Sequence, residues 1–216
     1  HCFVRGITIA LNDQAGGLIG EFRTLVDESS SSMINCYIRN CSSSCRVTAN
    51  NVCAGGLLGA VYAEIENNIT IENSFAQNSV SGFAYVGGLI GAVTGFYSQT
   101  VTIRNCCSYS NVNADPHIAN STYPDEHING ALIGQCIGNV IISKCYVKEQ
   151  PLFSFIGSHH GTQDRFSMKD TSFITNDGVT SQLNTPVTIN GIAHNNSVSA
   201  LNEWINLIAD DSYYTW

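Results

Sequence analysis

The segment Gly87-Gly88-Leu89-Ile90-Gly91-Ala92-Val93 decides the fold, because close copies of it recur along the chain. Good copies lie at residues 16–20, 55–61 and 130–134, and a degenerate one at 154–157. Two adjacent glycines suit a tight bend or a close approach of neighbouring backbones, and the apolar residues after them are typical of a short buried strand. Recurrence at intervals of tens of residues predicts stacked repeats.

A second motif precedes each glycine block and is built around a cysteine or serine with aromatic and β-branched neighbours. Its register positions are Cys2, Cys36, Ser74, Cys106, Cys145 and Ser172. Three strand-like stretches lie just upstream of the later copies: Ile69-Thr70-Ile71, Val101-Thr102-Ile103 and Val140-Ile141-Ile142. The motifs are fixed while the lengths between them vary, which indicates repeats whose connecting loops tolerate insertion.

One repeat holds two or three short strands and has no core of its own, so stacking must provide the core. We therefore predict an all-β fold, a parallel right-handed β-helix or β-solenoid of five to six coils. The solenoid is expected over residues 1–196, with the first coil incomplete and in need of a cover because its strand edges are open.

The last segment, residues 197–216, has the pattern of a capping helix with an aromatic tail. Ser197 or Ser199 can cap a helix that runs to about Ala209. One apolar stripe follows helical spacing and comprises Leu201, Trp204, Ile205 and Ile208. The candidate residues for capping the stack or for contacting a neighbouring molecule are Trp204, Tyr213, Tyr214 and Trp216.

The repeated GGLIG block, together with the preceding Asn-Cys/Ser-Tyr/Phe motif, resembles the GLUG-motif family of tandem glycine-rich repeats. The resemblance covers residues 1 to about 160 as repeats, and residues 197–216 resemble the terminal segment that often closes such arrays. It implies a β-solenoid in an extracellular adhesin-like or structural protein, and it implies no catalytic residue. Ala131 replaces the second glycine of the fourth copy, which predicts less regular last coils.

Composition excludes several classes of protein. The 216 residues carry a formal charge of -8, with only 9 Lys and Arg, so no basic face for nucleic acid is expected. Because 44% of residues are hydrophobic and 12% are charged, disorder is not expected. No apolar run approaches the roughly 18 residues of a membrane span.

The nine cysteines favour a secreted or cell-surface protein with disulfides, because cytosolic proteins rarely use so many. Stacked coils bring equivalent residues close together, so Cys2–Cys36 and Cys106–Cys145 are candidate bridges, the alternative being unbridged buried thiols. Nine is odd, which leaves one thiol free or paired with another chain. Candidate N-glycosylation sites are Asn40, Asn68, Asn120 and Asn195.

The sequence shows no catalytic motif, no cofactor motif and no metal-binding spacing. The densest polar groups are Asp125-Glu126-His127 and His159-His160 with Asp164, which are read as solvated loops, with metal binding as the alternative.

Three functions remain. The favoured one is a non-enzymatic structural module that self-associates end to end into a filament or adjoins another domain of a larger surface protein. The second is an adhesin or glycan-binding stalk that uses Tyr97, Tyr109 and Tyr123. The third is a glycan-active enzyme.

Overall fold

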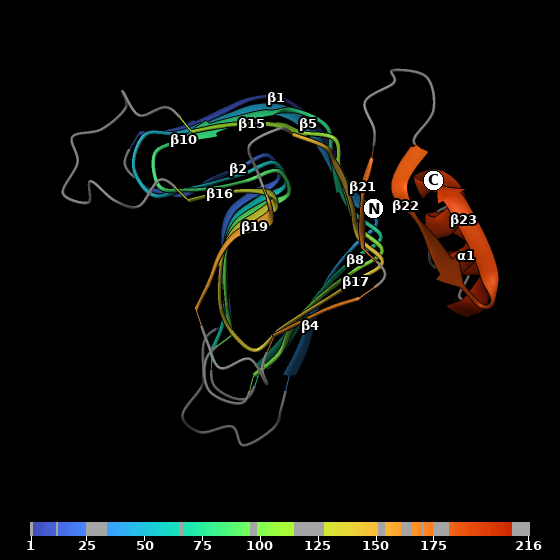
Figure 1. The fold of residues 1–216 in the computed structure, drawn as a ribbon. Helices are drawn as coiled ribbons and strands as arrows, with labels where there is room; N and C mark the ends of the chain where they lie inside the picture. Colours follow the sequence, from blue (N-terminus) through green and yellow to red (C-terminus); the bar gives the residue numbers. More distant parts are fainter. Residues whose placement is uncertain are drawn as a thin grey trace.

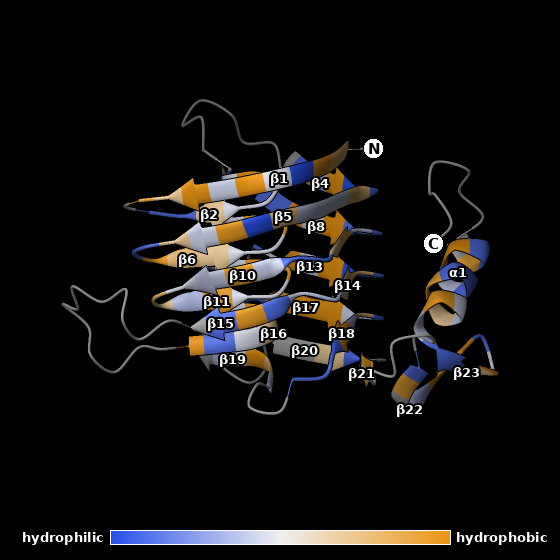
Figure 2. Cartoon of the chain, turned by 90° about the horizontal axis from the view of Figure 1, so that it is seen from above, coloured by the Kyte–Doolittle hydropathy of each residue, from blue (hydrophilic) through white to orange (hydrophobic). Residues whose placement is uncertain are grey.

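The structure of this chain is a computed structural model. It describes residues 2–11, 13–24, 34–64, 67–95, 99–114, 128–150, 154–160, 166–169, 171–174 and 182–208. Strands predominate among these residues, and they are arranged in three parallel sheets that run along one stack (Figures 1 and 2).

Sheet A forms one long side of the stack. Its outer column consists of β1 (Cys2–Ala10), β5 (Cys41–Ala49), β10 (Ser79–Gly82) and β15 (Asn111–Ala114). The long strand β5 continues into a second column with β9 (Phe75–Ala76), β14 (Cys107–Ser108), β18 (Tyr146–Lys148) and β21 (Ser172–Ile174).

Sheet B carries the glycine blocks and folds back on itself. One arm holds β2 (Ala15–Gly16), β6 (Cys53–Gly55) and β11 (Tyr85–Gly87). The other arm holds β3 (Ile19–Arg23), β7 (Leu58–Ala63), β12 (Ile90–Gly95) and β19 (Ser154–His160). The strand β16 (Ile128–Gly138) spans both arms, since it pairs with β11, β12 and β19.

Sheet C closes the third side. It contains β4 (Ile34–Arg39), β8 (Asn67–Glu72), β13 (Val101–Arg104), β17 (Val140–Ser143) and β20 (Phe166–Lys169).

Equivalent residues of successive turns lie over one another, as the recurring glycine block predicts. Gly55 pairs in register with Gly16 on one side and with Gly87 on the other, and Gly87 pairs with Gly130. The backbones approach so closely here that a Cβ on Gly56 would lie 2.2 Å from the carbonyl oxygen of Gly88. Glycine is therefore required by space at these positions.

The core lies between the three sheets and is built from columns of like side chains. Leu57, Leu89 and Leu132 form one column, and Ile71, Ile103 and Ile142 another; all six are fully buried. Burying one such side chain contributes roughly 1.5–3 kcal/mol, so the columns supply the main favourable term that holds the turns together.

A left-handed residue turns the chain from sheet C into sheet A in four successive turns. The residues are Asn40, Asn73, Asn105 and Lys144, with φ between 47° and 52°. Asparagine adopts this conformation more readily than other non-glycine residues, which explains its recurrence. The amide of Asn73 donates to Asn40 at 2.7 Å and that of Asn105 donates to Asn73 at 3.0 Å, so the corner is also a hydrogen-bonded ladder.

The C-terminal segment leaves the parallel pattern. The strand β22 (Gln182–Ile189) pairs antiparallel with β21 and with β23 (Ile192–Asn196), and α1 (Ser197–Ile208) follows. The predicted helix is confirmed, but Asn196 caps it, because its Oδ1 accepts hydrogen bonds from the backbone N–H groups of Val198 and Ser199. Leu201 and Trp204 of the predicted stripe are buried.

The predicted fold class is wrong as stated. We expected one β-solenoid of five to six coils over residues 1–196. The strands are instead divided among three parallel sheets, one of them folded nearly closed on itself, and the chain ends in an antiparallel hairpin. The physical causes are local: each turn is broken at the Gly-Gly bend and at the left-handed corner. Asn190-Gly191, with φ of 53° and 76°, makes a two-residue turn that reverses the chain.

The predicted cysteine column is also wrong in its first turn. Cys2 pairs in register with Cys41, whereas Cys36 pairs with Ile69. The error arises because Cys36-Tyr37-Ile38-Arg39 occupies the position of the sheet C strands and not that of the following motif. In the last turn Ser172 pairs with Tyr146, one residue beyond the predicted partner Cys145.

Candidate functional site

The N-terminal end of the stack is the most distinctive surface of the described chain. Within the part of the chain that the structure describes, its four strands β1, β2, β3 and β4 each pair with one strand only, namely β5, β6, β7 and β8. Inner strands such as β8 and β13 have a partner on each side. This end therefore presents unpaired backbone N–H and C=O groups, which are a ready template for another strand.

The strand β1 at this end has an apolar outer face. Alternate residues point outward, and the large apolar ones are exposed: Phe3 by 57%, Ile7 by 69% and Ile9 by 60%; Leu11, just beyond the strand, is 70% exposed. The exposed Arg5 lies between Phe3 and Ile7 on this face. The residues beside Ile7 and Ile9 on β5 are Arg46 and Thr48, and those on β10 and β15 are Ser79, Ser81, Asn111 and Asn113. The same face is thus polar on β5, β10 and β15, the other strands of this column.

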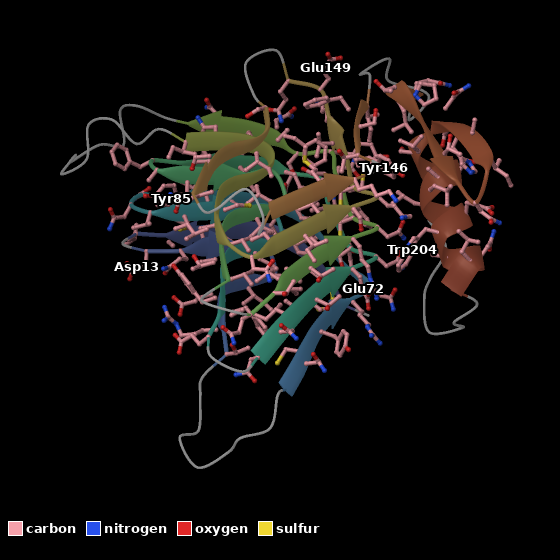
Figure 3. All side chains as sticks on the ribbon, turned by 60° about the horizontal axis from the view of Figure 1, so that its bottom comes forward. Asp13, Glu72, Tyr85, Tyr146, Glu149 and Trp204 are labelled. Atoms are coloured by element: carbon pink, nitrogen blue, oxygen red, sulfur yellow. The ribbon has the colours of Figure 1, made fainter. Side chains whose placement is uncertain are left out.

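The second column of sheet A also has an apolar outer face, but it is covered. Tyr146 and Cys107 are fully buried there against Leu183 and Val187 of β22 and Leu201 of α1. Tyr109 bonds Ser197 at the start of α1 at 3.1 Å. The guanidinium of Arg104 lies 5.5 Å from the ring centroid of Trp204, which Figure 3 shows beside the strands of the stack. Trp204 therefore lies in the segment that covers this side of the stack, and its predicted role in capping the last coil or in assembly stays a prediction.

A glycine column shows the same contrast between the first turn and the others. A Cβ on Gly59, Gly91, Gly134 or Gly157 would lie 2.3–2.6 Å from the carbonyl oxygen of the equivalent glycine in the preceding turn. In the first turn, a Cβ on Gly20 has its nearest neighbour, the Gln14 carbonyl oxygen, at 3.1 Å. Among the described residues, a Cβ on Gly20 would therefore be less crowded than one on Gly59, Gly91, Gly134 or Gly157, although the Gln14 carbonyl would still be a tight contact.

The opposite end of the stack is partly covered. The strand β22 lies on β21, and the side chain of Gln150 occupies the edge of β15. Its Oε1 accepts from the Val112 N–H at 2.9 Å, and its Nε2 donates to the Ser110 carbonyl at 3.2 Å. A side-chain amide thus replaces the next strand.

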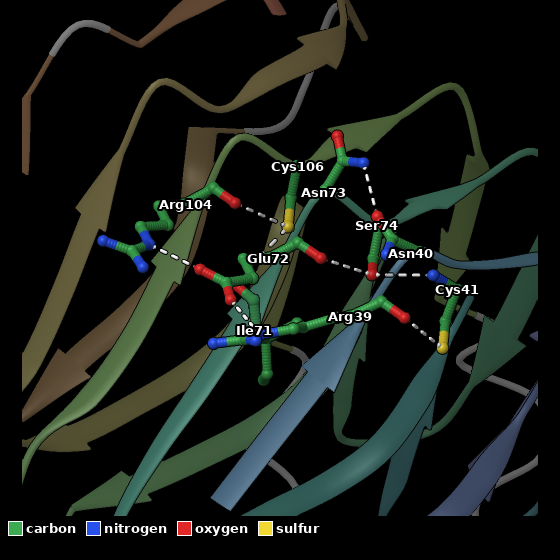
Figure 4. A network of polar contacts seen from close by, with 9 residues as sticks. All are labelled: Arg39, Asn40, Cys41, Ile71, Glu72, Asn73, Ser74, Arg104 and Cys106. Carbon is green, nitrogen blue, oxygen red and sulfur yellow. Dashed lines mark hydrogen bonds and ion pairs between the residues drawn. The ribbon is translucent and has the colours of Figure 1, made fainter. Parts of the chain in front are cut away.

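The strongest polar cluster lies at the corner of sheets C and A (Figure 4). The carboxylate of Glu72 is fully buried, and its two oxygens pair with Arg39 and, at 2.6 Å, with Arg104 from the turns on either side. The Ser74 hydroxyl donates to the Glu72 carbonyl at 2.8 Å. Because both carboxylate oxygens are held by cations, the cluster binds adjacent turns together and offers no free acid or base.

The thiols differ in how well they are protected. Burial raises the pKa of Cys53 and of Cys136 to about 12 and raises that of Cys107 further. Cys106 is fully buried, and its pKa is raised by burial first and by Cys145 second. Since the thiolate is the reactive form, these side chains are inert in the folded chain. Cys2 is exposed, and all nine thiols are unpaired in this structure.

The predicted glycosylation sites differ in access. Asn40 is buried and accepts the hydrogen bond from Asn73, so no glycan fits there in the folded chain. Asn68 is half-buried, donates to Asn35 at 3.4 Å and accepts from the Thr100 N–H at 2.9 Å. Asn195 is exposed on β23. Asn120 lies outside the described residues.

Other predicted residues are only partly placed. His159 and His160 end β19. Tyr109 is partly buried and bonded to Ser197, so it is not a free binding side chain. The candidates outside the described residues are Tyr97, Tyr123, Asp125, Glu126, His127, Asp164, Tyr213, Tyr214 and Trp216.

Within the described ranges, no three His, Cys, Asp or Glu side chains come together as a metal site. The one helix that the structure describes, α1, is too short to cross a membrane.

Comparisons with known proteins add little. No known protein family and no curated protein matches the chain. One solved structure is similar, a putative immunoglobulin A1 protease from Bacteroides ovatus, with 19% identity and a TM-score of 0.45. The match covers 90% of this chain and 43% of that one, so this chain spans less than half of that protein. A likeness this distant assigns neither a fold nor an activity.

Proposed function

We propose that this chain is a non-enzymatic structural module of an extracellular protein and that it assembles end to end with another copy through its N-terminal end. The observation that carries the proposal is the outer face of β1, whose Phe3, Ile7 and Ile9 are exposed although the same face is polar in the turns below. Contiguous exposed apolar residues mark interaction surfaces in soluble proteins.

Two further features support a strand as the partner. The backbone edges of β1 to β4 are open, so an added strand gains main-chain hydrogen bonds. Among the described residues, Gly20 has no glycine carbonyl of a preceding turn against it, whereas Gly59 and Gly91 do. A second copy that brings β19 over β3 would continue the column by placing its Gly157 over Gly20.

A specific observation favours a second candidate, an adjoining domain of a larger surface protein. The far end of the stack is partly covered by β22 and by Gln150. Direct stacking of copies would also bring Lys169, which stands beside Ser143 at the foot of sheet C, over Arg39. Like charges in adjacent strands are unfavourable. A domain with a carboxylate above Arg39 would avoid that repulsion.

The test is the assembly state of the full chain, measured by light scattering over a range of concentrations and by negative-stain microscopy. We expect rods longer than one molecule and a mass that rises with concentration. The double variant Ile7→Lys/Ile9→Lys should stay monomeric, because it puts two charges on the outer face of β1. The matched control is Ser79→Lys/Ser81→Lys, which adds the same charges to the outer face of β10 and should assemble normally.

A wild-type chain that stays monomeric at every concentration would refute assembly with another copy and leave the adjoining domain as the better explanation. Gly20→Ala provides a second variant, since it should reduce assembly while destabilising the monomer much less than Gly91→Ala does.

A further inference from the structure

The corrected register places five small polar or thiol side chains in one column at the corner of the stack. They are Cys2, Cys41, Ser74, Cys106 and Cys145. The last four have the same local geometry, because each donates to the carbonyl oxygen two residues earlier, at 3.0, 2.8, 3.2 and 3.3 Å. Only Ser74 in the middle lacks sulfur.

Cys2 and Cys41 face the same side of sheet A. On β1 the even-numbered residues Val4 and Ala10 pack against the core, while the odd-numbered residues are exposed. On β5 the partner of Ala10 is Ala49, which is fully buried. Side chains alternate along a strand, so Cys2 and Cys41 both lie on the inward face and side by side.

We propose that Cys2 and Cys41 form a disulfide that fastens the edge strand β1 to β5. Residues paired on adjacent strands have Cα atoms about 4.8 Å apart, which lies within the range of roughly 4.4–6.8 Å that a disulfide accepts. On the other side of Cys41 the column continues with Ser74, so within the described column Cys2 is the one cysteine adjacent to Cys41.

The reaction requires an oxidant, which we take to be a small disulfide such as oxidised glutathione. The exposed Cys2 thiolate attacks one glutathione sulfur, forms a mixed disulfide and releases one glutathione thiol. The Cys41 thiol then loses its proton and attacks the Cys2 sulfur, which releases the second glutathione thiol. Two protein thiols are oxidised and one glutathione disulfide is reduced.

The pair Cys106 and Cys145 lies in the same column, and its burial can be compared with that of Cys2 and Cys41. Both residues are fully buried, and burial raises the pKa of Cys106. Burial also raises the pKa of the half-buried Cys41 thiol, but Cys2 is exposed, so a soluble oxidant reaches the first pair through Cys2 and does not reach Cys106 or Cys145. Oxidation after folding should produce the first bond alone.

The experiment uses the full chain carrying Ile7→Lys/Ile9→Lys, so that its outcome does not depend on assembly. The protein is folded under reducing conditions, placed in a glutathione redox buffer, alkylated and digested with trypsin for mass spectrometry. Cleavage after Arg5 and Arg39 separates the peptides that contain Cys2, Cys36 and Cys41. We expect residues 1–5 linked to residues 40–46.

Cys41→Ser is the decisive variant, because Ser74 shows that a serine fits this position of the column. It should abolish the link and leave Cys2 as a mixed disulfide with glutathione, whereas Cys36→Ser should leave the link intact. In the linked protein the β1 amides should exchange hydrogen at least ten times more slowly than in the reduced protein.

A link from Cys2 to Cys36 or to a second chain would overturn the inference, as would a glutathione adduct that persists on Cys2 of the parent protein. If the link forms but the wild-type chain remains monomeric, the proposed assembly fails and the disulfide stands.

Discussion

The first turn and the turns beneath it are built from the same repeat, but they meet different surroundings. A Cβ on Gly91 would lie 2.4 Å from the Gly59 carbonyl oxygen, whereas a Cβ on Gly20, at the same position, would have its nearest described neighbour at 3.1 Å. Ser79 and Ser81 make the outer face of β10 polar, whereas Ile7 and Ile9 make that of β1 apolar. The outer face of the inner turns therefore suits contact with water. The outer face of the first turn has the apolar composition of a surface that another chain covers.

The difference in stability loss between an inner-turn variant and the matching first-turn variant should be largest in the glycine column. Gly91→Ala places a Cβ 2.4 Å from the Gly59 carbonyl oxygen, and backbone on that side cannot withdraw without breaking the sheet. We expect a loss of at least about 3 kcal/mol in the free energy of unfolding, the upper end of what overpacking usually costs. Urea denaturation measures the loss. Gly20→Ala is the matched control and should cost less than about 1 kcal/mol; equal losses in both variants would remove the contrast between the turns.

The second largest loss of stability should follow from replacing the buried carboxylate of Glu72. Glu72→Gln leaves Arg39 and Arg104 without a counter-charge between adjacent turns. Because both guanidinium groups remain about one-third exposed, solvent compensates in part, and we expect a loss of about 2 kcal/mol, below the usual cost of breaking a buried pair. Glu21→Gln, which breaks the exposed pair with Arg23 in the first turn, should cost less than about 0.5 kcal/mol. Urea denaturation measures both losses. Equal losses of unfolding free energy in the two variants would contradict a role for Glu72 in joining adjacent turns.

A smaller difference in stability loss is expected between a buried and an exposed isoleucine. Ile103→Val removes one methylene group from the fully buried column of sheet C and should cost about 1 kcal/mol. Ile7→Val removes the same group from the exposed face of β1 and should leave the monomer's thermal midpoint unchanged. If Ile7→Val destabilised the monomer as much as Ile103→Val, β1 would already be covered within one molecule.

The smallest effect concerns the left-handed corner. Lys144 has a φ of 52° at the position that asparagine occupies in three earlier turns. Lys144→Asn should therefore raise stability by about 0.5–1 kcal/mol, as a shift of the thermal midpoint to higher temperature. Lys169→Asn, on the strand β20, is the control and should bring no gain.

The accuracy of sequence-based prediction varied along the chain for identifiable reasons. Val101-Thr102-Ile103 was predicted as a strand stacked between its equivalents, and the structure confirms this, because its register with β8 and β17 follows from the alternation of apolar and polar residues. The partner of Cys2 was predicted wrongly, since Cys36 and Cys41 stand in similar surroundings five residues apart. The cover over Tyr146 could not be foreseen, because it depends on where the hairpin docks.

The stacking of the turns follows from local composition. Glycine at fixed positions lets the backbones of adjacent turns approach closely, and similar side chains at equivalent positions fill the space between turns. Local composition alone therefore specifies that the turns stack in register. The three-sheet arrangement, the reversal after β21 and the pairing of Cys2 with Cys41 were decided by the tertiary structure. Each of these features depends on which of several chemically similar segments packs beside another. That choice is made by contacts between segments far apart in the sequence, which a local sequence pattern does not specify.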